Sequence, residues 1–195
     1  PEAVKKGVQA AEAAAQNPKK AIKVATWLKL AECYVDAYAN PAGAGWIGAS
    51  AQELQFVMGG AKPLAVENVM LNGEPCVKEV YSTMDYYYNQ GGVLILIDVT
   101  KPIYDDALAS ALEAYSKAYE VDVKQTKVKD IATGIADIAK KYLDEGMNQY
   151  TLGDYAAASV LFEKAAQASA TEPLAKIDTT ALYNSGFTAW MVKDY

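Results

Sequence analysis

The side chains that most enzymes use to move protons or to hold metals are missing from this sequence. It contains no histidine, and all eighteen of its basic residues are lysines. Histidine is the usual general base near neutral pH, and arginine holds phosphate or carboxylate through paired hydrogen bonds. The chain is also acidic, with a net charge of −6. We therefore exclude nucleic-acid binding, phosphoryl transfer and histidine-dependent hydrolysis.

The remaining candidates for acid–base or metal chemistry are carboxylates. Asp105 and Asp106 stand directly before an expected helix, where acidic side chains favour the positive helix end, so capping is preferred over metal binding. Asp137, Asp144 and Glu145 fall on a long expected helix and are typical of its solvated face. The sequence spells no calcium loop, phosphate loop or nucleophile elbow. It therefore predicts a protein that is not an enzyme and that uses no cofactor and no metal.

One glycine pattern has the spelling of a dinucleotide-binding fingerprint. Gly43-Ala-Gly45-Trp-Ile-Gly48 fits G-x-G-x-x-G, which needs a strand before it and a helix directly after it to hold the pyrophosphate. Here a helix and Asn40-Pro41 come first, and no βαβ unit follows. A flexible loop is therefore the preferred interpretation.

The two cysteines, Cys33 and Cys76, are too few and too far apart in the sequence for a zinc site. A disulfide between them is left open. Two buried thiols are the preferred interpretation, because free cysteine behaves as a small apolar residue.

The densest aromatic cluster is formed by Tyr81, Tyr86, Tyr87 and Tyr88. In a strand, side-chain alternation would place Tyr86 and Tyr88 on one face and Tyr87 on the other. An exposed tyrosine face formed by Tyr81, Tyr86 and Tyr88 could bind a carbohydrate or a peptide. Packing between this segment and neighbouring helices is preferred, and binding is kept as the alternative.

An internal repeat indicates which elements position these residues. Two stretches, residues 142–155 and 182–195, each carry a glycine, an aromatic residue and an Asp-Tyr pair in the same order. The matched pairs, each separated by 40 residues, are Gly146 and Gly186, Tyr150 and Trp190, and Asp154-Tyr155 and Asp194-Tyr195.

A second kind of helix follows the first of these stretches. It carries a small, an aromatic and a small residue at helical spacing, and an earlier helix repeats that order. The two sets are Ala158, Phe162 and Ala165, and Ala111, Tyr115 and Ala118. Alternation of the two kinds of helix predicts antiparallel helix pairs that stack on their neighbours.

These motifs resemble the tetratricopeptide repeat (TPR), most fully over residues 142–165. The stretch with Trp27, Leu30, Ala31 and Tyr34 resembles the first helix of another copy. The spacing of 40 exceeds the usual period of about 34 residues, and we expect the additional residues between Ala170 and Thr179. Both ends of the sequence cut through repeats, so the array is expected to be longer.

In this family, ligands lie on the concave face formed by the first helix of each pair. The resemblance therefore implies an apolar, aromatic partner-binding surface and a protein or peptide partner. The residues assigned to it are Leu143, Met147, Tyr150, Tyr183, Phe187 and Trp190. The competing interpretation is that these side chains are covered by the insert, by a further repeat or by a second copy of the chain.

Residues 39–104 do not follow the repeat. Ser50 and Glu53 form the pattern of a capping box, and Asn72-Gly73 and Asn89-Gln-Gly-Gly92 are hairpin signals between strand-like runs. The segment is expected to hold one helix and about three antiparallel strands. It resembles the small outer-membrane lipoprotein domains of the SmpA/OmlA type, and the pairing of repeats with such an insert resembles exported proteins of gut Bacteroidetes.

The expected fold is therefore mainly α, a TPR-like solenoid of antiparallel helix pairs with an inserted α+β element. Residues 1–38 would hold the N-terminal helix and the first helix of a repeat, 39–104 the insert, and 105–195 the continuing helices. The expected function is a non-enzymatic scaffold for protein–protein interaction. A periplasmic or exported location is preferred over a cytoplasmic one, and a homo-oligomer and a peripheral envelope association are left open.

Overall fold

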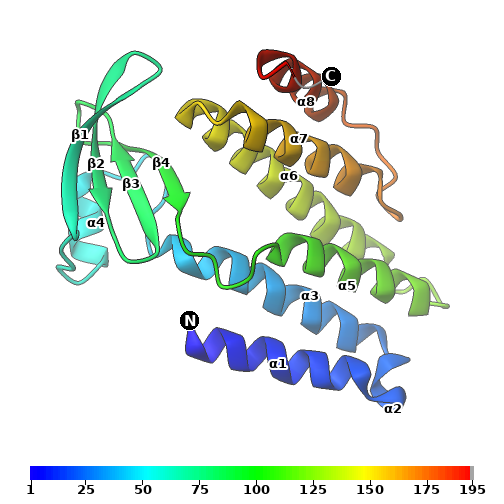
Figure 1. Cartoon of the computed structure of the whole chain (residues 1–195). Helices are drawn as coiled ribbons and strands as arrows, with labels where there is room; N and C mark the ends of the chain where they lie inside the picture. The colour runs from blue at the N-terminus through cyan, green and yellow to red at the C-terminus, as the bar shows by residue number, and fades with distance from the viewer. Residues whose placement is uncertain (194–195) are drawn as a thin grey trace.

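The protein is mainly helical, with one small antiparallel sheet (Figure 1). The structure is a computed structural model that describes residues 1–193, and Asp194 and Tyr195, which the repeat match includes, lie outside the described residues. The helices are α1 (Glu2–Gln16), α2 (Pro18–Ala21), α3 (Val24–Ala39), α4 (Ala51–Val57), α5 (Ala107–Val121), α6 (Val128–Leu152), α7 (Tyr155–Ala170) and α8 (Thr179–Met191), with a 3₁₀ turn, η1, at Asn40–Ala42. The prediction of a mainly α protein with a small α+β element is confirmed.

The long helices lie side by side in chain order, and successive helices run in opposite directions (Figure 1). α1 packs on α3, α3 on α5, α5 on α6, α6 on α7 and α7 on α8. α3 and α5 are neighbours although the whole sheet lies between them in the sequence. Their buried faces form one apolar core, whose larger members include Leu108, Tyr115, Ile131, Ile135 and Ile138. No helix in residues 1–193 combines the length and apolarity needed to cross a membrane.

Aspartates begin three of these helices. The Asp106, Asp154 and Asp178 carboxylates accept hydrogen bonds from backbone N–H groups in the first turns of α5, α7 and α8. The capping role predicted before α5 is thereby confirmed for Asp106. α6 ends at Gly153, whose φ of 85° is in the left-handed region that glycine adopts most easily. The loop after α7 occupies residues 171–178, where the sequence predicted the additional length.

The sheet has four strands in the order β1 (Ala65–Leu71), β2 (Glu74–Val80), β3 (Met84–Tyr88) and β4 (Leu94–Val99), all antiparallel. The expectation of about three strands is therefore one short. The run from Val77 to Tyr88 folds back on itself, because the Tyr81 N–H donates to the Met84 carbonyl across a tight turn. The hairpin turn at Asn72-Gly73 is present, with φ of 50° and 83°.

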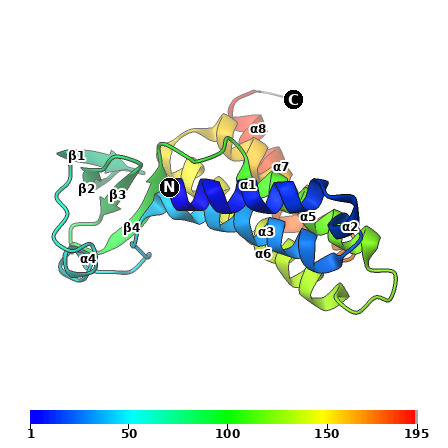
Figure 2. The same cartoon turned by 90° about the horizontal axis from the view of Figure 1, so that it is seen from below.

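The sheet and α4 lie beyond one end of the helices, as the view from below also shows (Figure 2). One face of the sheet packs on α4, where the Ser50–Glu53 capping box is present. On the other face, Leu152 from the end of α6 packs with Tyr87 and Leu96. Cys33 is buried among the helices and Cys76 in the sheet, and both are free thiols. The preferred interpretation of the cysteines is confirmed.

Candidate functional site

Four of the six residues predicted for the partner-binding surface line one groove. Met147 and Tyr150 of α6 lie across from Tyr183 and Phe187 of α8 around a cavity of about 190 Å³. Buried Phe162 of α7 also lines it, together with Asn184 and Thr188. We call this cavity the α6–α8 groove.

Aromatic rings continue from this groove along α8. The Tyr183 and Phe187 rings stack with their centroids 6.2 Å apart and their planes 5° from parallel. Phe187 in turn lies 6.2 Å from Trp190. Tyr183 is 70% exposed and Trp190 is 65% exposed, so the helix presents large apolar side chains to solvent. Exposed aromatic side chains gathered on one face are typical of a binding surface.

The two other predicted residues, Leu143 and Trp190, do not line the groove. Leu143 is partly buried against the helical core, where it supports α6. Trp190 is not among the residues that line the groove, and its ring lies 6.2 Å from that of Phe187, which is. The structure therefore brings four of the six predicted residues together and leaves Leu143 and Trp190 outside the groove lining.

The alternative site in the insert is not at the surface. Tyr86 is 0% exposed and Tyr88 is 4% exposed, since both pack with Leu54 of α4 in the core of the insert. Tyr81 is half-buried and its ring lies 5.4 Å from that of Tyr86. The alternative of an exposed tyrosine face is therefore wrong, and the preferred interpretation, packing against helices, agrees with the contacts of Tyr86 and Tyr88 with Leu54 and of Tyr87 with Leu152. The predicted alternation is correct, because Tyr87 packs on the opposite face of the sheet.

The glycine pattern before α4 accommodates one of these tyrosines. The Tyr86 hydroxyl accepts a hydrogen bond from the Gly45 N–H at 2.9 Å and donates one to the Ala42 carbonyl at 2.7 Å. A Cβ atom added at Gly45 would lie 2.6 Å from that hydroxyl oxygen. The segment is a loop, and its glycine allows the backbone to approach the tyrosine closely. Burial raises the pKa of Tyr86.

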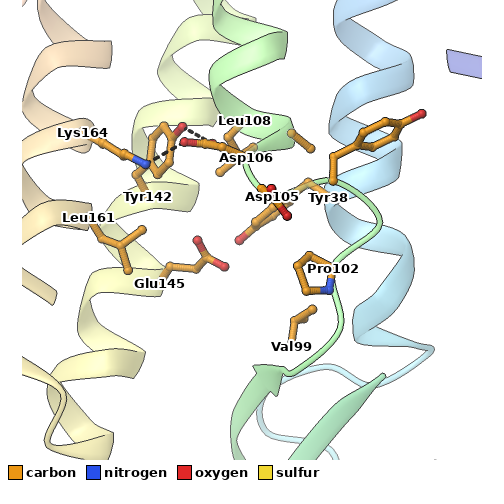
Figure 3. A pocket seen from close by; sticks show the side chains of 12 residues that line it. Tyr38, Val99, Pro102, Asp105, Asp106, Leu108, Tyr142, Glu145, Leu161 and Lys164 are labelled. Atoms are coloured by element: carbon orange, nitrogen blue, oxygen red, sulfur yellow. Dashed lines mark hydrogen bonds and ion pairs between the residues drawn. The ribbon is translucent and has the colours of Figure 1, made fainter. Parts of the chain in front are cut away.

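A second cavity, of about 140 Å³, lies where the insert meets the helices (Figure 3). Its polar wall is a hydrogen-bonded set centred on Asp106. The Lys164 ammonium lies 2.6 Å from the Asp106 carboxylate, and the Tyr142 hydroxyl donates to the same carboxylate at 2.7 Å. Burial acts to raise the pKa of Asp106, but these partners and the Ala109 N–H together hold the pKa below its usual value. Sequence reasoning did not find this junction cavity, because its residues come from four separate segments.

Among the described residues, two carboxylates of this cavity have no hydrogen-bond or ion-pair partner, exposed Asp105 and partly buried Glu145 (Figure 3). Burial first, and then the negative charges of Asp106 and Asp98, raise the pKa of Glu145 to about 7, against the effect of the Lys164 ammonium. The placement of Glu145 on a solvated face is therefore wrong. Its neighbour Asp144 does lie at the surface, where it pairs with Lys140.

Comparison with known proteins gives no relative for this chain. No family model, no curated protein and no solved structure matches it.

Proposed function

We propose that this protein is a non-enzymatic helical-repeat scaffold of the TPR kind, which binds a protein partner in the α6–α8 groove. The observation that carries the proposal is the gathering of Met147, Tyr150, Tyr183 and Phe187, from two helices, around one cavity. Three of these four side chains are aromatic, and Tyr183, Phe187 and Met147 are exposed. Such side chains supply most of the binding energy in protein–protein interfaces.

The groove has a firm base, which favours binding without rearrangement. Phe162 beneath it is 1% exposed, and Thr188 is 1% exposed with its hydroxyl donating to the Asn184 carbonyl at 2.7 Å. α8 is joined to α7 by two reciprocal hydrogen bonds between Ser159 and Ser185. A preformed site loses less conformational entropy on binding than one that must be ordered by its ligand.

The dimensions and chemistry of the groove favour an apolar side chain of a peptide or protein. A cavity of about 190 Å³ accommodates one large apolar side chain, and the Asn184 amide offers a polar contact beside it. The groove lining contains no charged residue. The envelope location stays a prediction from the sequence, and peripheral envelope association stays open.

The test compares the natural chain with Tyr183→Ala/Phe187→Ala. A partner is isolated from the source cells on the immobilised chain, purified, and its Kd measured by calorimetry. We expect the double variant to weaken binding at least tenfold while its circular dichroism is unchanged, because two exposed side chains are removed.

The matched control is Phe56→Ala, since Phe56 is an aromatic residue on α4 that is 88% exposed and remote from the groove. It should bind the partner with unchanged affinity. A partner whose Kd is the same for the natural chain and for the groove variant would contradict the proposal.

A further inference from the structure

The two edges of the sheet differ in how the chain covers them. At the β4 edge, the Leu94 carbonyl accepts a hydrogen bond from the Gly48 N–H at 2.8 Å, and the Leu94 N–H donates to the Ala49 carbonyl at 2.8 Å. Further along β4, the Asn148 amide donates to the Ile97 carbonyl at 3.4 Å. The loop before α4 and the last turns of α6 therefore cover this edge.

The β1 edge has no such cover within residues 1–193. β1 pairs with β2 alone, and no backbone hydrogen bond joins its outer side to another described segment. β4, the strand that contacts α6, lies at the opposite edge of the sheet. Figures 1 and 2 show β1 on the side of the sheet that faces away from the helices. Further helices of the array would stack beside α1 or α8, remote from this edge.

The outer side of β1 lacks the features that keep an edge strand from pairing. Exposed edges of monomeric proteins are usually short or carry lysine, proline or a bulge. β1 has seven residues, contains neither lysine nor proline, and pairs with β2 in an unbroken register. Val66 is 62% exposed and Met70 is 63% exposed. An edge of this kind is a template for a further strand.

The turn after β1 determines which of its backbone groups point outward. Asn72-Gly73 forms a two-residue turn, so Leu71 and Glu74 on either side of it exchange backbone hydrogen bonds. Hydrogen-bonded and non-hydrogen-bonded pairs alternate along an antiparallel ladder. The N–H and C=O groups of every second residue before Leu71 therefore point away from β2. These residues are Val66, Asn68 and Met70.

The sequence of β1 matches itself when two copies run antiparallel. Asn68 is the middle residue of the strand, so pairing about Asn68 uses its whole length. Asn68 then faces Asn68 of the second copy, and Val66 faces Met70 on either side, which gives polar and apolar cross-strand pairs. A register centred on Glu67 would instead place two carboxylates directly opposite each other, which is unfavourable. In the register about Asn68, Glu67 faces Val69 of the second copy and keeps its ion pair with Lys78.

The charges at the two ends of β1 are also complementary. Lys62 precedes the strand, Glu74 follows the turn at its other end, and both residues are exposed. An antiparallel second copy brings each Lys62 beside the turn that carries the other copy's Glu74. A parallel copy would bring lysine to lysine. The charge pattern therefore favours the antiparallel arrangement that the backbone groups allow.

We propose that two copies of this chain associate through β1, which pairs antiparallel with itself about Asn68 and joins the two sheets into one continuous sheet. The helices of each copy lie on the far side of its own sheet, so they extend away from this interface (Figure 1). The dimer carries two α6–α8 grooves. The proposal is therefore independent of the proposed function of the groove.

Sedimentation equilibrium of the intact chain over a range of concentrations measures the association, and we expect a reversible equilibrium between monomer and dimer. Asn68→Lys and Asn68→Asp each place like charges opposite each other at the centre of the interface. Each should raise the Kd of the dimer at least about fivefold. Residue 68 is exposed, so both variants should fold, and circular dichroism checks this. An equimolar mixture of the two variants should dimerise more tightly than either variant alone, because lysine then faces aspartate.

The matched control is Gln167→Lys, which adds the same charge at an exposed position of α7 and should leave the Kd of the dimer unchanged. A chain that stays monomeric up to its solubility limit overturns the proposal. Self-association that neither Asn68 variant weakens also overturns it, since another surface is then responsible. A mixture that associates no better than its components overturns the symmetric register.

The two proposals fail separately. Tyr183→Ala/Phe187→Ala should dimerise as the natural chain does, because these residues lie on α8 and not on the sheet. Loss of partner binding in that variant tests the groove, and the Kd of the dimer tests β1.

Discussion

α6 and α8 carry the same pattern of residues over the described part of the repeat, yet they have opposite surroundings on one face. Gly146 lies under the ring of Phe162, whereas Gly186 meets nothing. On the other face both helices contact the element before them, but α6 presents Glu145 there and α8 presents Ser185. The residue pattern of a helix therefore defines its faces, whereas the neighbouring elements decide whether each face is buried or open.

The largest difference in stability between the two helix faces should appear when the Phe162 ring, which covers Gly146, is removed. Phe162→Ala would leave a cavity between α6 and α7, and we expect a loss of about 3–5 kcal/mol in the free energy of unfolding. Trp190→Ala, on the open face of α8, should cost less than about 1 kcal/mol because its side chain is already largely in water. Urea denaturation measures both. Equal losses would mean that the face of α8 is covered in solution.

The faces of α6 and α8 that contact the preceding element should contribute differently to the pH dependence of stability, because α6 presents Glu145 there and α8 presents Ser185. The pKa of Glu145 is about 7 in the folded chain and lies near the usual value for glutamate, 4.5, when the chain is unfolded. The protonated form is therefore favoured by folding, so this contribution is fully present below pH 4.5 and is lost as the pH rises to about 7.

Glu145→Gln should remove that dependence. We expect the variant to exceed the natural chain in stability at pH 8 by on the order of 1–3 kcal/mol, with the difference vanishing near pH 4. Denaturation at a series of pH values between 4 and 8 measures it. A pH-independent difference would contradict the pKa of Glu145. Ser185→Ala, at the matching position of α8, serves as the control, because no carboxyl is changed.

The two matched glycines should respond to alanine with opposite signs. Gly146→Ala forces a methyl group against the Phe162 ring, and we expect a net loss of about 1–2 kcal/mol after the gain in helix propensity is counted. Gly186→Ala meets no neighbour, so only the helix propensity acts and stability should rise by about 0.5–1 kcal/mol. Thermal unfolding of the Gly146→Ala and Gly186→Ala variants measures the two changes in stability. A stabilising Gly146→Ala would show that α7 does not seat its ring there.

The smallest effect should come from the serine pair that joins α7 to α8. Ser159→Ala removes one hydroxyl donor to the Ser185 carbonyl, at 3.0 Å, and should cost about 0.5–1 kcal/mol. Ser116→Ala is the control, because that hydroxyl donates within its own helix, to the Leu112 carbonyl. Amide hydrogen exchange should quicken in α8 for Ser159→Ala alone. Unchanged exchange in α8 would mean that apolar contacts hold it without the serines.

Local sequence signals predicted the helices, the capping box before α4 and the Asp106 cap of α5. The Ser50–Glu53 capping box and the turn at Gly153 depend on residues close together in the chain, so their signals are complete within a few positions. The strand count was one short, because the turn at Ser82-Thr83 has neither the glycine nor the proline that usually marks such a turn. The burial of Tyr86 depends on Gly45, which is 41 residues away.

The sequence by itself determined which side chains share a face. The helical period and the repeat placed Met147 with Tyr150 and Phe187 with Trp190, because side chains three or four residues apart lie on one side of a helix. Only the tertiary structure decided which of these faces is covered. Burial and the pKa of Glu145 depend on neighbours from distant segments, such as Asp98, Asp106 and Lys164, and no local pattern records those neighbours.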